Sequence, residues 1–122
     1  MKSMLLVIAV ALCVSSNAQS SAEKANGPDC SGGWPTNMTF VHMKNAGLVD
    51  NSSIDFSKTK TVRLVSQKVG KDLWRQVYHV TYTKKSGEAI EAIAVPDAST
   101  EECSMTGVDV YVISRHLGGK DD

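Results

Sequence analysis

The segment at residues 73–83 constrains the fold most, because its side chains alternate in character from one residue to the next. One set of alternate positions is the more apolar and holds Trp74, Gln76, Tyr78, Val80 and Tyr82, and the other holds Leu73, Arg75, Val77, His79 and Thr81. Successive side chains of a strand point to opposite faces of a sheet. The period therefore predicts a strand whose Trp74-to-Tyr82 face packs against another layer.

Three further segments rich in β-branched residues predict neighbouring strands at 61–69, 88–95 and 108–117. Turn-forming residues lie at 70–72 and 84–87 between the first three strands. Pro96 should end the third strand, since proline has no N–H to donate to a ladder. The longest break inside the expected sheet runs from residue 96 to 107, and Ser99 is placed to cap one helical turn there.

A helix is expected at residues 37–46. Met38, Val41 and Ala46 belong to a broad apolar stripe at helical spacing. Pro35 with the side-chain oxygens after it is typical of a helix start, and Gly47 of a helix end.

The expected element order is therefore α-β-β-β-β. This order predicts an α+β domain in which an N-terminal helix packs on a four-stranded antiparallel sheet. The layout is analogous, in topology alone, to cystatin-like folds, and topology does not determine function. A chain of 122 residues allows one domain. We expect it at 35–118, after an N-terminal arm at 19–34 and before a frayed tail at 119–122. Residues 19–29 of the arm are polar and should be loosely held.

Residues 1–18 are typical of a cleaved signal peptide. Lys2 precedes the apolar run 4–14, and Ser16 and Ala18 are small residues placed for a cut before Gln19. A helix formed by the apolar run 4–14 would be about 16 Å long, which is too short to cross a hydrocarbon core of ~30 Å. Lipid attachment at Cys13 would require a small residue before the cysteine, and Leu12 is large. We expect a periplasmic or secreted protein without membrane attachment after cleavage.

Cys30 and Cys103 are the two cysteines that remain after such a cut. A cysteine pair in an exported chain predicts a disulfide. This disulfide would close a loop of 73 residues and stabilise the fold by roughly 4 kcal/mol. A redox or metal-binding pair is the alternative, but the sequence has no Cys-x-x-Cys and no Cys/His cluster.

The sequence offers no arrangement typical of catalysis or of metal or cofactor binding. His42, His79 and His116 lack metal-ligand spacing, and the nucleophile-elbow, P-loop and dinucleotide motifs are absent. Balanced charges, 13 basic against 13 acidic, give no preference for nucleic acid. The segment 31–33 before the helix has the backbone N–H groups for an anion site, yet a tight turn explains it more simply.

These features favour a small exported, non-enzymatic protein-binding domain, such as an inhibitor or immunity protein of the bacterial periplasm. Two alternatives remain. One is a ligand-binding or enzymatic domain with a pocket between helix and sheet, whose candidate residues are Tyr78, Tyr82, His79 and Glu91. The other is an envelope accessory or structural protein.

The expected disulfide also predicts where a protein partner binds. It would draw the segment 32–34 beside the loop 97–107, and loops on a rigid sheet carry most recognition. The candidate contact residues are Trp34, Glu101, Glu102 and Met105. Trp34 is either a core anchor or an exposed contact. The turns at 70–72 and 84–85 are expected together at the opposite end of the domain.

Overall fold

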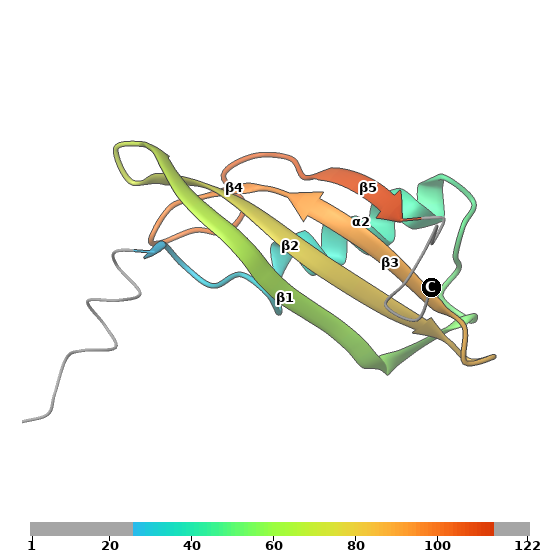
Figure 1. Ribbon diagram of the computed structural model, residues 1–122. Helices are drawn as coiled ribbons and strands as arrows, with labels where there is room; N and C mark the ends of the chain where they lie inside the picture. The colour runs from blue at the N-terminus through green and yellow to red at the C-terminus, as the bar shows by residue number, and fades with distance from the viewer. Residues whose placement is uncertain (1–25, 114–122) are drawn as a thin grey trace, which may run out of the picture.

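The computed structural model describes residues 26–113, in which a helix packs on one antiparallel sheet (Figure 1). The elements are α2 (Trp34–Asn45), β1 (Ile54–Gly70), β2 (Leu73–Lys84), β3 (Ala89–Val95), β4 (Asp97–Ala98) and β5 (Asp109–Ile113). The expected signal peptide, the arm before residue 26, the last strand beyond 113 and the tail lie outside the described residues. Within 26–113 no helix is long and apolar enough to span a membrane.

The sheet has the strand order β1-β2-β3-β5, which confirms the expected helix followed by an antiparallel meander. The short strand β4 was not expected. It pairs with the start of β2, with Trp74 opposite Ala98 and Arg75 opposite Asp97. Pro96 ends β3, but its carbonyl oxygen still accepts the Gln76 N–H at 3.0 Å. Pairing along β2 therefore resumes after the proline.

The observed start of an element differs from the expected one by three or more residues at two places. The helix starts at Trp34 rather than at residue 37, with Pro35 in its first turn, where proline's missing N–H costs nothing. β1 starts at Ile54 rather than at residue 61. Its register against β2 shifts between Asp55 and Lys60, which indicates a bulge.

The loop after β4 forms no helical turn at residues 99–102. The Ser99 hydroxyl does accept the N–H groups of Glu101 and Glu102, at 3.3 and 3.0 Å. The Ser99 N–H donates to the Glu102 carbonyl oxygen at 2.8 Å. The serine thus closes a tight loop instead of starting a helix.

The core lies between α2 and the predicted face of β2. All five side chains of that face are buried: Trp74, Gln76, Tyr78, Val80 and Tyr82. Behind the sheet in Figure 1, α2 runs across β2 and β3 and buries Met43 and Thr39. Ala92 and Ala94 of β3 are fully buried, and their small side chains leave room for the helix.

Candidate functional site

A disulfide joins the chain before α2 to the loop after β4, as expected. Cys30 and Cys103 are bonded, with their Cα atoms 5.8 Å apart. Beside this bond, Trp34 Nε1 donates to the Thr106 carbonyl oxygen at 3.1 Å. The residues before the helix and the loop after β4 therefore lie side by side.

The N-terminal segment 26–29 is fixed on β1 and β2, contrary to the expectation of a loosely held arm. One Arg63 nitrogen donates to the carbonyl oxygens of Asn26, Gly27 and Pro28, closest to Pro28 at 2.8 Å. Gln76 Nε2 also donates to the Pro28 carbonyl oxygen, at 2.6 Å. These donors replace the pairing that an irregular segment lacks.

Gly27 shows how closely this segment approaches the sheet. Its φ is +73°, and a Cβ atom there would lie 2.7 Å from the indole ring of Trp74. Only glycine fits both the backbone conformation and this contact.

The turn between β1 and β2 lies at the same end as the disulfide, so its expected position at the opposite end is wrong. Asp72 Oδ1 accepts the Thr100 N–H at 3.0 Å. Each turn of an antiparallel meander reverses the chain, so the first turn and the loop after β3 meet at one end. Counting reversals along the expected strands could have placed this turn correctly.

We call this region the disulfide end and define it as residues 26–30, 69–73 and 99–106. In Figure 1 it is the left end of the described domain, where the β1–β2 turn, the N-terminal segment and the loop after β4 gather. Glu101, Glu102 and Met105 are exposed there, Met105 by 45%. Trp34 is half-buried against the core and is therefore an anchor of the loop.

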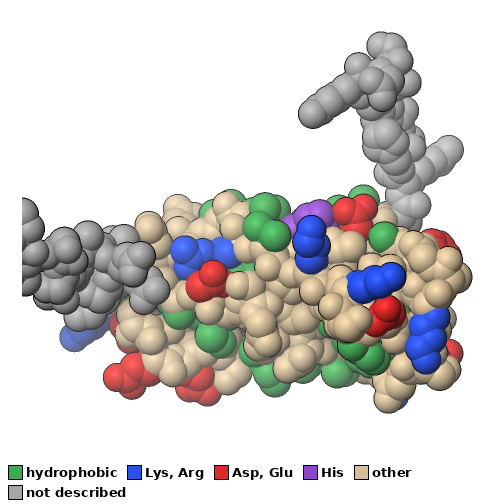
Figure 2. Space-filling view, turned by 90° about the horizontal axis from the view of Figure 1, so that it is seen from below, with side chains coloured by type: hydrophobic (Ala, Val, Ile, Leu, Met, Phe, Trp, Pro, Cys, Tyr) green, Lys and Arg blue, Asp and Glu red, His purple; other side chains and the backbone are tan. Residues whose placement is uncertain are grey.

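Three exposed residues of this end were missed by the sequence reasoning: Val69, Lys71 and Asp72. Lys71 and Asp72 belong to the misplaced turn, and Val69 lies next to it at the end of β1. Together with the acidic pair Glu101 and Glu102, they give the disulfide end charges of both signs. Over the part of the surface seen in Figure 2, basic and acidic side chains are likewise interspersed.

The four candidates for a catalytic or ligand pocket do not converge. His79 Nε2 and Glu91 Oε1 lie at a hydrogen-bond distance of 3.0 Å on the face of the sheet away from the helix. Tyr78 and Tyr82 lie on the helix face, because neighbouring residues of a strand point to opposite faces. Tyr78 is fully buried, donates to Gln76 Oε1 at 2.6 Å and accepts the Cys30 N–H at 2.8 Å. Burial also raises its pKa.

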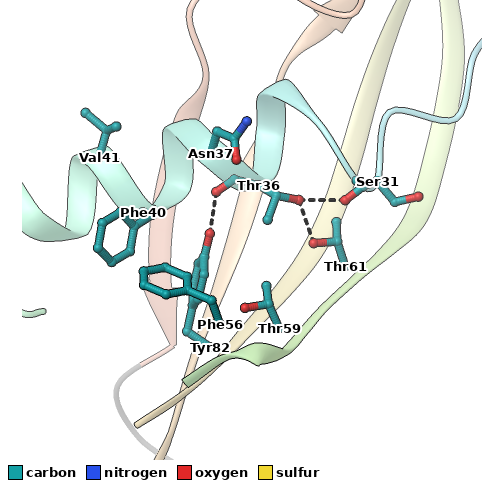
Figure 3. A pocket seen from close by; sticks show the side chains of 10 residues that line it. Ser31, Thr36, Asn37, Phe40, Val41, Phe56, Thr59, Thr61 and Tyr82 are labelled. Carbon is teal, nitrogen blue, oxygen red and sulfur yellow. Dashed lines mark hydrogen bonds between the residues drawn. The ribbon is translucent and has the colours of Figure 1, made fainter. Parts of the chain in front are cut away.

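Tyr82 does line an open groove, between α2 and β1 (Figure 3). Its hydroxyl donates to the Thr36 carbonyl oxygen at 2.6 Å, and burial raises the pKa of Tyr82 to about 12. The groove has a volume of about 680 Å³. The space between helix and sheet is thus hollowed on the β1 side.

The segment 31–33 forms a tight turn, as expected, in preference to an anion site. The Gly33 N–H donates to the Cys30 carbonyl oxygen at 3.1 Å, and the Ser31 N–H to Asp29 Oδ1 at 3.0 Å. The Ser31 hydroxyl donates a hydrogen bond to the same carboxylate and is the main cause that lowers the pKa of Asp29.

Among residues 26–113, no cluster of three or more His, Cys, Asp or Glu side chains is placed to hold a metal ion.

Comparison of the chain with protein-family models, curated proteins and solved structures finds no match.

Proposed function

We propose that this protein is a small exported, non-enzymatic protein-binding domain that engages a protein partner through the disulfide end. The observation that carries the proposal is the fixation of three segments, far apart in the sequence, at one end of the sheet. A covalent bond and main-chain contacts with Arg63, Gln76 and Asp72 hold them together.

Fixed loops suit recognition because little conformational freedom is lost on binding. At the disulfide end the apolar side chains of Val69 and Met105 are exposed beside Lys71, Glu101 and Glu102. Apolar groups with charged neighbours are the usual chemistry of a protein interface. The β1–β2 turn projects past the other strands in Figure 1, which fits insertion into a recess of the partner. An inhibitor or immunity protein that fills the recess of a hydrolase or toxin would have this form.

The disulfide supports an oxidising compartment outside the cytoplasm. Together with the sequence of residues 1–18, it supports export to the periplasm or beyond. Mass spectrometry of the exported chain is expected to find Gln19 as its first residue. A chain that begins at Met1, or that carries lipid on Cys13, would contradict export by a cleaved signal peptide.

The test of the binding surface starts with a partner captured from an extract of the producing cell's envelope by the oxidised protein. Its affinity is then measured for the double variant Lys71→Glu/Met105→Asp. Both side chains are exposed, so the melting temperature should change little while the affinity falls at least tenfold. Lys85→Glu, an exposed charge reversal at the other end of β2, is the matched control and should bind like the parent.

A second control lies on the sheet face away from the helix, where the Tyr111 side chain is 62% exposed. Tyr111→Asp should leave the affinity unchanged. If Tyr111→Asp or Lys85→Glu abolishes binding while the double variant binds like the parent, the partner docks elsewhere and the proposed site is wrong. Failure to capture any protein overturns the proposed function itself.

A further inference from the structure

The groove between α2 and β1 lies away from the exposed loops of the disulfide end and has the size of a small-molecule site. Its volume of about 680 Å³ falls within the ~300–1,000 Å³ of ligand pockets. Ten residues line it, from the turn before α2, the first turns of α2, the first half of β1 and the end of β2: Ser31, Gly32, Thr36, Asn37, Phe40, Val41, Phe56, Thr59, Thr61 and Tyr82.

Three aromatic rings form one wall of the groove. Phe40 of α2, Phe56 of β1 and Tyr82 of β2 point toward one another in Figure 3, with ring centroids 5.1 to 6.2 Å apart. Two of the three pairs meet edge to face, a favourable aromatic geometry. Phe56 nevertheless remains 49% exposed. Apolar ring surface therefore stays open to whatever enters the groove.

Hydroxyl groups form the other wall. Thr36 Oγ1 donates to the Ser31 carbonyl oxygen at 2.6 Å and lies 2.6 Å from Thr61 Oγ1. Thr59 differs from both. Its Oγ1 is inaccessible to solvent and has no hydrogen-bond partner among the described residues. Leaving a buried hydroxyl unpaired is unfavourable. Thr59 lines the groove, so a ligand that enters and shifts the side chains covering this hydroxyl would supply the missing partner.

The lining carries no formal charge, since none of its ten residues is Asp, Glu, Lys, Arg or His. A charged ligand would lose hydration on entry without gaining a counter-charge. A neutral ligand would lose less, and it could contact the rings and the hydroxyls together.

We propose that this groove binds a small uncharged molecule with an apolar ring-sized body and a hydroxyl or amide group. The body lies against Phe40, Phe56 and Tyr82, and the polar group bonds to Thr59 Oγ1. This site is separate from the proposed protein-binding surface, so either proposal can fail without the other.

The test is an NMR titration of the ¹⁵N-labelled oxidised protein with benzyl alcohol and benzamide. We expect saturable shifts at the amides of Gly32, Asn37 and Thr59, and none at Glu91 on the opposite face of the sheet. Benzoate and benzylammonium keep the ring but add a charge, and they should bind at least tenfold more weakly.

Variants assign the contacts. Thr59→Val keeps the side-chain shape and removes only the hydroxyl, so benzyl alcohol should bind about three- to tenfold more weakly. Thr81→Val makes the same change on the other face of the sheet and should bind like the parent. The proposal is overturned if neither neutral probe gives saturable shifts at the groove, if the charged probes bind as well, or if Thr59→Val has no effect.

Discussion

The two ends of the β2–β3 hairpin are held in different ways. At the disulfide end, residues far apart in the sequence are joined by the disulfide Cys30–Cys103. Hydrogen bonds from Arg63 to three carbonyl oxygens, and from the Thr100 N–H to Asp72, add to it. At the other end, the turn from Lys84 to Glu88 is closed mostly by its own residues. The Gly87 N–H donates to the Lys84 carbonyl oxygen at 2.8 Å, with φ at Gly87 of +95°.

This difference follows from what each end connects. A short turn between paired strands needs no support beyond its own hydrogen bonds and a residue that accepts a positive φ. The segments 26–30 and 99–106 are irregular and have no ladder of their own. The disulfide and distant side chains hold them in position against the sheet, and such positioning is useful where a surface recognises a partner.

Of the changes that test this difference between the two ends, removal of the disulfide should have the largest effect on stability. Cys103→Ser, with Cys30→Ser in the same chain to avoid a free thiol, should lower the free energy of unfolding by about 2–5 kcal/mol, because a long loop is no longer closed in the unfolded state. Denaturant titration measures this change. An unchanged stability would show that the remaining contacts hold the disulfide end alone.

Tyr78→Phe should have the next largest effect. The variant leaves Gln76 Oε1 and the Cys30 N–H without their buried partner, at a cost of about 1–3 kcal/mol. Tyr111→Phe, which changes an exposed tyrosine, is the matched control and should leave the free energy of unfolding unchanged. Equal effects in the two variants would argue against a structural role for the buried hydroxyl.

Alkaline pH should test the groove region in the same molecule. Burial holds the pKa of Tyr82 at about 12, against 10.0 in the unfolded chain. Between these values the unfolded state releases the proton and the folded state retains it. The contribution of Tyr82 to stability is therefore complete below pH 10 and is lost as the pH rises to 12.

The measurement is the free energy of unfolding against pH for the parent and for Tyr82→Phe. The parent should lose more stability than the variant over this window. Tyrosinate absorbance with a midpoint near pH 10 that disappears in the variant would contradict the raised pKa.

The sequence predicted the parts of the fold that depend on periodicity. The alternation through Trp74, Tyr78 and Tyr82 identified the buried face of β2, and the spacing of Met38 and Val41 identified the helix. The start of β1 was missed because residues 57–60 are all polar and a register shift lies between Asp55 and Lys60, so this stretch lacks a strand's regular alternation.

The candidate site was predicted only in part. Cys30 and Cys103 placed Glu101, Glu102 and Met105 correctly beside the segment before the helix. The fixation of residues 26–29 depends on Arg63. The alternation of side chains along β1 predicts the face of the sheet on which Arg63 lies, but it does not predict which carbonyl oxygens its side chain contacts. The groove depends on Phe56 turning toward Phe40 next to the register shift, a contact that no local pattern indicates.

The smallest effect is expected at the end opposite the disulfide. Lys84 Nζ lies 3.4 Å from Glu88 Oε2, and the Glu88 side chain is largely exposed. Exposed ion pairs are screened by water and contribute little, so Glu88→Gln should change the free energy of unfolding by less than about 0.5 kcal/mol. Salt should not change the difference between parent and variant, because little charge interaction is present to screen. A loss above about 1 kcal/mol would mean that this turn depends on side-chain contacts as the disulfide end does, and the contrast between the two ends would no longer hold.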